Sequence, residues 1–516
     1  MKRRYVAAFL AAATMATTVG TSLTGASAAR VSAVDRTNPF QPSANKFCVK
    51  KGNEATSVLK SNPGMGYTDK EIKVGHLRSD LDKLVPFGIY VDHGNMVETT
   101  RVFTDIINNV CGGIRGRKLV VIDKGYHPAV ASQRDSVAQQ LWDDHKPAAA
   151  YTTSGWTGPG VQFLVKDVKV PLLSGEGGSL ALMRTGNYFS FGSYPAEVAV
   201  NALMDSLGNM KALKKTDIVG VVSPETDGIA AGVEPLIKAR LRKLGIKPQN
   251  IHFAQITCTG KGTGQCAGKP ELAAKFKAAG MNATNGVYIP IGVGSGEILP
   301  VMETMASAGV DFRVSYSTGL SNAAGDTQAN TMCTKGATSA GCLGWLKTRF
   351  LDWTFAGPHR TLKKLDPFTQ MCVDEYNKGY GVATNGTATV LANNPVRIGM
   401  IASVCPALRL IAAGIWAAGD NPKRIDIAKG IRNLGDVDFR FALPATTRPG
   451  KPWFGKEMFW QRGQAPCPPT NGVNDLVGVP GKQTVAAGCL FLDAELNKIK
   501  GAKVSIDYQL KNLQKG

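Results

Sequence analysis

The sequence predicts an α/β fold of two doubly wound, Rossmann-like lobes with parallel central sheets. Short apolar segments alternate with segments of helical periodicity from residue 71 to residue 316, which is the pattern of right-handed βαβ units. The segment Leu119-Val120-Val121-Ile122 is apolar on both faces, as a parallel strand between two helical layers is. Because the chain has more strand–helix units than one open sheet comfortably holds, two lobes are expected.

The elements are expected in regular order along the chain. The first strand is placed at 72–77 and the first helix at about 91–110, where Cys111-Gly112-Gly113 ends it because glycine accepts the left-handed turn after a helix. The further strands are expected at 119–122, 148–151, 170–173, 217–222, 251–256, 286–291 and 312–316. The further helices are expected at 129–143, 158–165, 198–207, 229–244, 270–279 and 298–308.

The alternation breaks after the last of these strands. Residues 322–357 are rich in Gly, Ala and Thr and have no assigned role. Helices resume at 368–378, 396–418 and 425–433, and the aromatic and Pro/Gly-rich region 437–492 is expected to form closing strands and hairpins. No role is assigned to this long C-terminal region either.

The N-terminus has the features of a secretory signal peptide. A basic start (Lys2, Arg3, Arg4) precedes a short apolar run and the small-residue site Ala26-Ser27-Ala28, so cleavage is expected near Ala28. The adjacent Arg3 and Arg4 leave open whether the protein is exported by the twin-arginine (Tat) route or by the general secretory (Sec) route. The apolar run is too short to cross a bilayer, so residues 1–28 are expected to be a signal peptide and the mature protein to be secreted or periplasmic.

The chain is basic, with a formal net charge of +21. A basic surface favours peripheral contact with an anionic cell surface, although a merely solubilising role explains the same charge. The basic residues form no arginine-rich helix and no patch interleaved with aromatic residues, so no nucleic-acid partner is expected. The protein is expected to be a monomer that needs no cofactor.

All ten cysteines follow the signal peptide, and an even number in an oxidising compartment indicates disulfides. Sequence alone does not fix how ten cysteines pair, but two pairs each flank a loop, and six cysteines then remain for three further pairs. The expected pairs are Cys258–Cys266, Cys333–Cys342, Cys372–Cys405, Cys467–Cys489 and Cys48–Cys111. A zinc site is the rival, but the chain has no C-x-x-C motif and its six histidines lack ligand spacing, so no metal is expected.

Residues 107–119, which read INNVCGGIRGRKL, resemble the leucine/isoleucine/valine-binding and amide-binding components of ABC transporters. In that branch of the type I periplasmic-binding-protein fold, the motif is followed by a strand, an acidic residue (here Asp123) and a Pro-Ala helix start (here Pro128-Ala129). The likeness is clear over residues 71–320 and looser beyond them. The glycines of the motif are assigned to structure, because they turn a helix into a buried strand.

The resemblance implies a division into two lobes joined by a three-segment hinge near residues 188–196, 312–320 and 434–456. Lobe 1 comprises residues 71–190 and 318–435, and lobe 2 comprises 191–317 and 436–500. Residues 29–70 form an N-terminal extension held by Cys48, and 501–516 form a C-terminal tail.

Ligands of open α/β sheets bind beyond the carboxyl ends of the strands. In lobe 1 these positions carry Asp80 after the first strand, Ser154-Gly155-Trp156-Thr157 after the third, and Glu176, Gly178 and Ser179 after the fourth. The family places hydroxyl groups and backbone amides of the last two loops against a ligand carboxylate. Helix capping by Ser154 or Thr157, and a core position for Trp156, are the alternatives.

In lobe 2 the resemblance implies ligand contacts from Tyr194, Asp227 and Thr318. Thr318 stands where the amino-acid-binding pattern has a glutamate for the ligand's ammonium group. Either Asp227 takes that role or the ligand has no ammonium group, and Asp227 as a helix cap is the alternative. The identity of the ligand therefore stays open.

The predicted function is capture of a small polar ligand, such as an amino acid, amide or similar carboxylate, by hinge closure and its delivery to an ABC permease. A ligand-sensing or cell-surface interaction protein of the same fold, with a membrane sensor as partner, is the alternative. A secreted hydrolase is the third reading, and the chain lacks an evident nucleophile–base pair, a G-x-S-x-G motif and a P-loop. No catalytic residue is therefore assigned, and the protein is not expected to be an enzyme.

Overall fold

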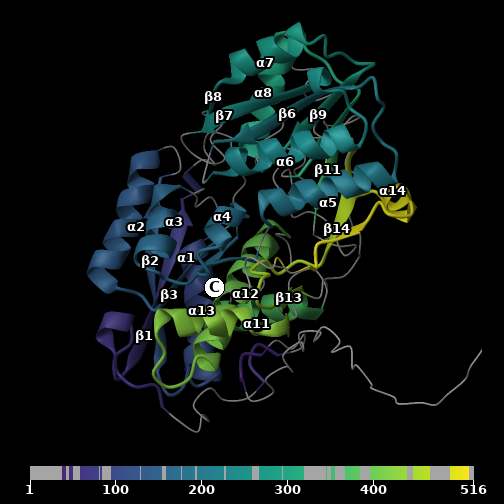
Figure 1. Cartoon of the computed structure of the whole chain (residues 1–516). Helices are drawn as coiled ribbons and strands as arrows, with labels where there is room; N and C mark the ends of the chain where they lie inside the picture. The colour runs from purple at the N-terminus through teal and green to yellow at the C-terminus, as the bar shows by residue number, and fades with distance from the viewer. Residues whose placement is uncertain are drawn as a thin grey trace, which may run out of the picture.

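A computed structural model provides the structure of the protein. It describes residues 38–41, 46–49, 58–80, 82–83, 95–127, 130–153, 158–175, 177–191, 194–225, 228–258, 266–292, 295–318, 345, 350–354, 367–383, 395–437, 445–464, 489–508 and 510. Two sheets, each covered by helices, form two lobes (Figure 1). The predicted α/β class with parallel central sheets is confirmed.

The first sheet has five parallel strands in the order β2–β1–β3–β4–β5. Their bounds are Glu71–Ser79 (β1), Lys118–Tyr126 (β2), Ala149–Thr152 (β3), Leu172–Ser174 (β4) and Tyr188–Ser190 (β5). Strands β3, β4 and β5 are buried throughout, as strands between two layers of helices are. Because all five strands run in the same direction, their carboxyl ends lie at one edge of the sheet.

The helices of the first lobe come from both halves of the chain. The first half supplies α1 (Met96–Asp105, extended by a π-helical turn at Ile106–Val110), α2 (Ala131–His145), α3 (Pro159–Gln162, extended at Phe163–Asp167) and α4 (Leu180–Met183). The second half supplies α11 (Pro367–Ala383), α12 (Pro395–Ala417) and α13 (Arg424–Arg432), and α11 and α12 pack on α1. Short 3₁₀ turns lie at Pro63–Met65 and Pro248–Asn250.

The glycines after α1 have the structural role that the sequence predicts. Gly112 and Gly113 have φ values of 77° and 78°, which only glycine adopts without strain. A Cβ atom on Gly113 would lie 2.4 Å from the carbonyl oxygen of Arg117. This turn leads the chain directly from α1 into β2.

Helix α12 is the central helix of the first lobe. Its segment Met400–Ala417 is long and apolar enough to cross a membrane, but 89% of it is buried inside the protein, as in a core helix of a globular fold. The buried Arg409 of this helix donates from Nη2 to the carbonyl oxygen of Lys46 at 2.7 Å. The guanidinium also lies 5.5 Å from the centre of the Phe368 ring, so an aromatic ring and a carbonyl oxygen both contact this buried cation.

The second sheet contains nine strands, with β15–β14–β11–β10–β9–β6–β7–β8 in order and β16 paired with β14. The strands β11, β10, β9, β6 and β7 are parallel to one another. Strands β14 and β8 pair antiparallel with β11 and β7, and β15 and β16 pair antiparallel with β14. Their bounds are Ile218–Pro224 (β6), Ile251–Cys258 (β7), Cys266–Ala267 (β8), Gly286–Pro290 (β9), Val314–Ser317 (β10), Phe350–Thr354 (β11), Glu457–Gln464 (β14), Cys489–Leu492 (β15) and Val504–Ser505 (β16).

The helices of the second lobe are α5 (Ala196–Asn209), α6 (Ile229–Lys243), α7 (Lys269–Ala278), α8 (Ser295–Ser307) and α14 (Ala494–Lys498). Figure 1 shows α5 and α6 side by side on this sheet, and α7 and α8 packed together. A separate two-stranded sheet, β12 (Gly435–Val437) and β13 (Ala445–Thr447), follows α13.

Three features differ from the expected division of the chain. Strand β11 lies in the second sheet, although residues 318–435 were assigned to lobe 1. The chain therefore returns to the first lobe between Thr354 and Pro367 and not at 312–320. The expected C-terminal tail also belongs to the fold, because β16 pairs with β14 and Ala502 and Ile506 are fully buried.

The N-terminal extension packs against the first lobe. Phe40, Phe47 and Leu59 are buried in the same core as α1, α11 and α12. The disulfides Cys48–Cys111 and Cys372–Cys405 form as predicted. Cys266 is also disulfide-bonded, and β8 places it opposite Cys258 in register. The side chain of Cys258, the remaining four cysteine side chains and residues 1–28 lie outside the described part.

Candidate functional site

The carboxyl ends of the two sheets converge at the first crossover, between β5 and α5. The backbone nitrogen of Ala196 donates to the carbonyl oxygen of Gly178, which follows β4, at 3.2 Å. The hydroxyl of Tyr194 donates to the carbonyl oxygen of Thr318, which follows β10, at 3.3 Å. The backbone nitrogen of Gly292, after β9, donates to Oγ1 of Thr318 at 3.4 Å. Three predicted site residues, Gly178, Tyr194 and Thr318, therefore lie around one crossover.

The third crossover runs beside the first. Ser190, at the end of β5, donates from its backbone to Pro452 at 3.0 Å and accepts from Phe454 at 3.1 Å. The fully buried Lys451 donates from Nζ to the carbonyl oxygens of Thr446 and Trp453, each at 2.7 Å. Burial lowers the pKa of Lys451 to about 7. Two of the chain segments that join the lobes are thus tied to each other by backbone hydrogen bonds.

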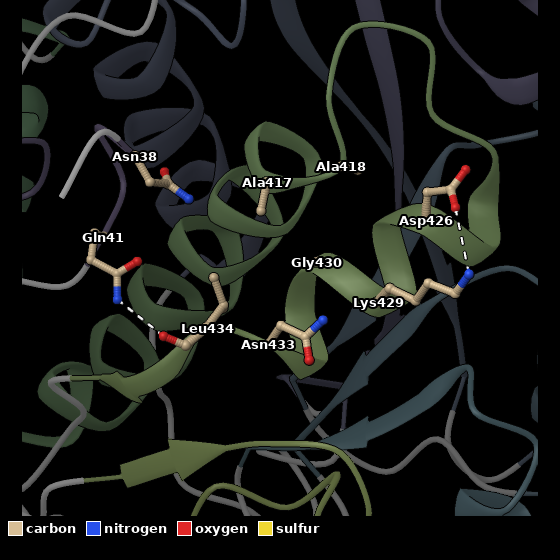
Figure 2. A pocket seen from close by; sticks show the side chains of 9 residues that line it. All are labelled: Asn38, Gln41, Ala417, Ala418, Asp426, Lys429, Gly430, Asn433 and Leu434. Carbon is tan, nitrogen blue, oxygen red and sulfur yellow. Dashed lines mark hydrogen bonds and ion pairs between the residues drawn. The ribbon is translucent and has the colours of Figure 1, made fainter. Parts of the chain in front are cut away.

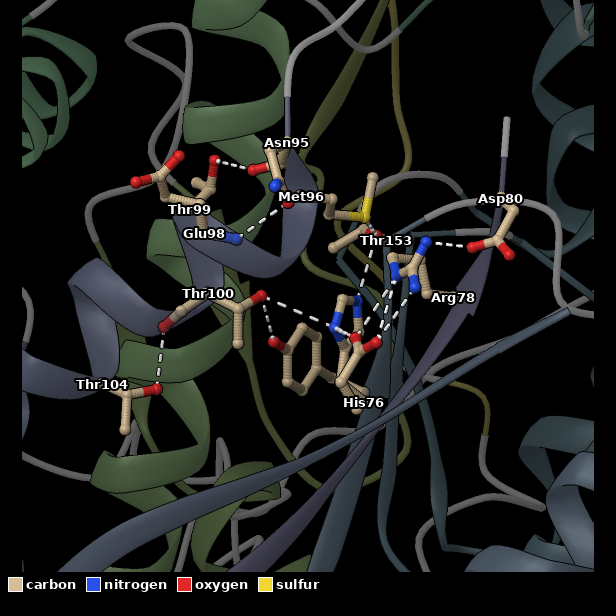
Figure 3. Close-up of polar contacts among 12 residues, drawn as sticks. His76, Arg78, Asp80, Asn95, Met96, Glu98, Thr99, Thr100, Thr104 and Thr153 are labelled. Carbon is tan, nitrogen blue, oxygen red and sulfur yellow. Dashed lines mark hydrogen bonds and ion pairs between the residues drawn. The ribbon is translucent and has the colours of Figure 1, made fainter. Parts of the chain in front are cut away.

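A polar cluster lies at the carboxyl ends of β1, β2 and β3 (Figure 3). His76 contacts Asp123 through Nδ1 at 2.7 Å, and its ring stacks on Tyr151 with centroids 4.3 Å apart and planes inclined by 4°. Thr100 of α1 lies within hydrogen-bonding distance of the Tyr151 hydroxyl, at 2.9 Å. On the other side of the ring, His76 Nε2 lies 3.5 Å from Oγ1 of Thr153. The cluster thus joins α1 to the loop that follows β3.

The carboxylates of this cluster neutralise its arginine. Arg78 bonds Asp123 through Nε and Nη2, at 3.3 Å and 3.1 Å, and also bonds Asp80. Asp80 bonds Lys83 at 2.9 Å as well. Because Arg78 already pairs with two carboxylates, its charge is neutralised and it is not an unpaired cation that could bind an anionic ligand. Asp80, a predicted ligand contact, is likewise engaged in this network.

The protonation states follow from burial and these partners. His76 is fully buried, and this burial lowers its pKa below the ordinary value, with the hydrogen bond to Asp123 offsetting part of the effect. Burial alone would raise the pKa of Asp123, but its hydrogen bonds and charge interactions with His76 and Arg78 outweigh burial and lower it. The pair is therefore a neutral imidazole beside a carboxylate at neutral pH.

Ser179 begins helix α4. Its buried side chain accepts a hydrogen bond from the backbone nitrogen of Leu182 at 3.2 Å, so it caps the helix. The preceding Gly178 has a φ of 71°, which suits glycine. The structure thus gives this predicted contact a capping role, and nothing observed tests a further role toward a ligand.

Glu197 is a buried acid at the crossover that the sequence analysis did not single out. Its Oε2 accepts from the backbone nitrogen of Leu180 at 3.0 Å, joining α5 to the start of α4. Burial raises the pKa of this carboxyl. The only sequence signal was an acid in the first turn of a predicted helix, which is common and seldom functional.

Two buried hydroxyls at strand ends have no hydrogen-bond partner within the described part of the chain. They belong to Ser79, the last residue of β1, and Ser223 near the end of β6. A buried hydroxyl without a partner costs free energy, so both positions are candidates for contact with a ligand or water. Each lobe thus contributes one unsatisfied hydroxyl at the carboxyl ends of its strands.

The other predicted contacts lie outside the described residues: Ser154, Gly155, Trp156, Thr157, Glu176 and Asp227. Their flanking residues are described, and Thr153 belongs to the polar cluster. No group of three or more His, Cys, Asp or Glu side chains that could hold a metal ion occurs among the described residues.

A separate pocket of about 280 Å³ lies on the first lobe between the N-terminal segment and helices α12 and α13 (Figure 2). Gln41 donates from Nε2 to the carbonyl oxygen of Leu434 at 3.2 Å at its edge. Lys429 and Asp426 face each other at 3.9 Å on the other side. No residue of this pocket belongs to the strand ends, so it is distinct from the candidate site.

Comparison with known proteins identifies the fold. No family model and no curated protein matches the sequence. A fatty acid ABC transporter substrate-binding protein from Thermomonospora curvata matches with a TM-score of 0.54 and 15% identity, over 89% of this chain and 97% of that one. A possible leucine/isoleucine/valine-binding protein from Rhodopirellula baltica matches with a TM-score of 0.52 and 13% identity, over 78% and 96%.

A third solved structure gives the same result. It is the closed conformation of a leucine-, isoleucine-, valine-, threonine- and alanine-binding protein from Brucella ovis, with a TM-score of 0.50, 13% identity, and coverage of 86% of this chain and 97% of that one. These likenesses show that the chain has the type I periplasmic-binding-protein fold. The fold inferred from residues 107–119 and the surrounding βαβ units is thereby confirmed.

Proposed function

We propose that this protein is a solute-binding protein that captures a small ligand between its lobes and delivers it to an ABC permease. The observation that carries the proposal is the convergence of both sheets' carboxyl ends at the crossover near Tyr194 and Ala196. A ligand in contact with both edges would favour the closed state over the open one. The similar solved proteins are substrate-binding proteins and not enzymes, which supports a binding role.

We propose a ligand with a carboxylate group. Two of the similar proteins bind fatty acids and amino acids, and both ligand classes carry a carboxylate. In lobe 1, Arg78 is already neutralised, so hydroxyls and backbone amides of Ser154, Thr157 and Gly178 are the better candidates for binding this group. In lobe 2 we propose Asp227 and Thr318 as contacts.

The remaining assignments complete the proposal. Trp156, Gly155, Glu176 and Ser179 would line the lobe 1 side, and Asp80 would hold Arg78 in place rather than contact the ligand. The protein would act as a monomer outside the cytoplasm, after removal of the signal peptide near Ala28. Its lobes would comprise one sheet each, joined by the crossovers described above.

A thermal-shift screen tests the proposal. The purified mature protein, unfolded and refolded to remove carried-over ligand, is tested with amino acids, fatty acids, amides and aromatic acids. A ligand at 100 times its dissociation constant should add about 2.7 kcal/mol to the unfolding free energy. A carboxylate ligand whose effect disappears in Ser154→Ala protein is expected, with Ser136→Ala on α2 as the matched control. Absence of any shift over the whole panel would contradict small-carboxylate capture.

A further inference from the structure

A group of exposed cations lies at the amino-end edge of the second sheet, opposite the candidate site. We call it the basic pole and define it as Lys211, Lys214, Lys215, Arg242, Lys243 and Lys500, all exposed. The first three precede β6, the next two end α6, and Lys500 follows α14. Figure 1 shows α14 beside α5, whose end leads to Lys211.

Close contacts bring these three segments together. A Cβ atom on Gly245, just after α6, would lie 3.5 Å from the Lys215 side chain. A Cβ atom on Gly208 of α5 would lie 2.9 Å from Leu244. Asn209, the last residue of α5, donates from Nδ2 to the carbonyl oxygen of Gly501 at 3.2 Å. The basic pole is therefore one continuous surface made from three parts of the chain.

Acids near the basic pole are already engaged. Asp205 pairs with Arg240, Glu495 pairs with Lys498 at 2.7 Å, and the buried Asp217 pairs with Arg313 at 2.6 Å. No ion pair involves the six cations of the basic pole within the described part of the chain. Their summed charge is thus directed to solvent, where it attracts an anionic partner.

An exposed apolar side chain indicates which kind of anionic partner fits. Ile499, between Lys498 and Lys500, is 46% exposed. A soluble polyanion has no apolar region in which this side chain could be buried, whereas the interface of a bilayer accepts apolar side chains flanked by lysines. Five of the six cations are lysines, which act as point charges toward phosphate headgroups.

We propose that the basic pole and Ile499 dock this protein on an anionic lipid surface. Because the basic pole lies at the opposite edge of the second sheet from Ser223 and Thr318, docking there leaves the candidate site free. The inference goes beyond the proposed function and does not depend on it. Each cation near an anionic leaflet strengthens attachment, and salt weakens it because surface charges are screened.

Vesicle co-sedimentation tests the charge contribution. The mature protein is mixed with phosphatidylcholine vesicles that contain or lack phosphatidylglycerol, at low and high salt. Binding only to anionic vesicles at low salt is expected. The variant Lys215→Glu/Lys243→Glu should bind at least about tenfold more weakly. The matched control Lys70→Glu/Lys118→Glu has the same change in net charge on exposed lysines of the first lobe and should bind nearly as the parent does.

The variant Ile499→Ser tests the choice of a bilayer. It should weaken vesicle binding about threefold or more while leaving binding to soluble dextran sulfate unchanged. Ile425→Ser, which changes an exposed isoleucine of α13, is its control and should change neither. Equal losses in the two double charge variants would overturn the proposal, as would binding to dextran sulfate without binding to anionic vesicles. Circular dichroism verifies that every variant is folded.

Discussion

Asp123 connects β2 to two residues of β1. It contacts His76 at 2.7 Å and Arg78 at 3.1 Å, and all three side chains are mostly buried. The Asp123→Asn substitution leaves the Arg78 charge with one carboxylate fewer, so we expect a loss of about 2 kcal/mol in unfolding free energy, measured by urea denaturation. As a control, Asp144→Asn removes the exposed partner of Lys124 at 3.7 Å and should cost less than about 0.5 kcal/mol. Equal losses in the two variants would contradict this account.

His76 makes stability depend on pH. Its pKa is lower in the folded protein, so the unfolded chain binds its proton first as the pH falls. The free energy of unfolding should therefore decrease as the pH falls below about 6.5, the ordinary histidine pKa. The His76→Gln variant should show a smaller decrease between about pH 7.5 and 5.5 than the parent does. An identical pH dependence in parent and variant would contradict a buried neutral imidazole.

A matched variant separates this contribution from that of His252. Burial also lowers the pKa of His252, although this ring is less enclosed. The His252→Gln substitution should therefore reduce the pH dependence less than His76→Gln does. Asp123, with its own lowered pKa, adds to the loss of stability at lower pH because the unfolded chain again binds a proton first.

The sequence predicted residues whose position depends on the backbone better than it predicted contacts between side chains. Gly112, Gly178 and Thr318 were predicted from their place at helix or strand ends, and the structure has them there. His76 and Glu197 were missed, although each is a polar residue among apolar ones in the printed sequence. Which partners they meet depends on α1, β2 and α4 coming together, and local periodicity does not report such contacts.

Among the elements, the N-terminal segment depends on a single covalent link. Cys48–Cys111 closes a sequence separation of 63 residues and holds the segment that buries Phe40 and Phe47. The Cys48→Ser/Cys111→Ser variant should lose about 4 kcal/mol of unfolding free energy, and Cys372→Ser/Cys405→Ser, with a separation of 33, slightly less. Thermal unfolding under non-reducing conditions measures both. A reductant should lower the melting temperature of the parent protein. It should have no such effect on a variant from which the disulfides that it reduces have been removed. A Cys48→Ser/Cys111→Ser protein as stable as the parent would contradict a structural role.

Long helices were predicted to within about a residue at each end, as α6 and α12 show. Strand β11 was missed because its five residues, Phe350–Thr354, lie at the end of a Gly/Ala/Thr-rich region, although Phe, Trp and Thr favour strands. The segment that contains β16 was expected to be a tail for a different reason. Its Ile506 is buried by residues far away in sequence, including Trp453, whose Nε1 donates to the carbonyl oxygen of Ile506 at 2.9 Å.

At the scale of the whole molecule, the two lobes are linked by neighbouring chain segments. Ser190 bonds to Pro452 and Phe454, so the first and third crossovers lie side by side. Bending there would move one sheet edge toward the other with small changes within each lobe, as happens in hinged binding proteins. Opposite strand ends would then close around the ligand.

Small-angle X-ray scattering with and without a saturating ligand from the thermal-shift screen tests this closure most directly. The radius of gyration should decrease when the ligand binds, and the decrease should be absent in a Ser154→Ala variant that no longer binds it. An unchanged radius of gyration in protein that calorimetry shows to be fully occupied would contradict capture by hinge closure.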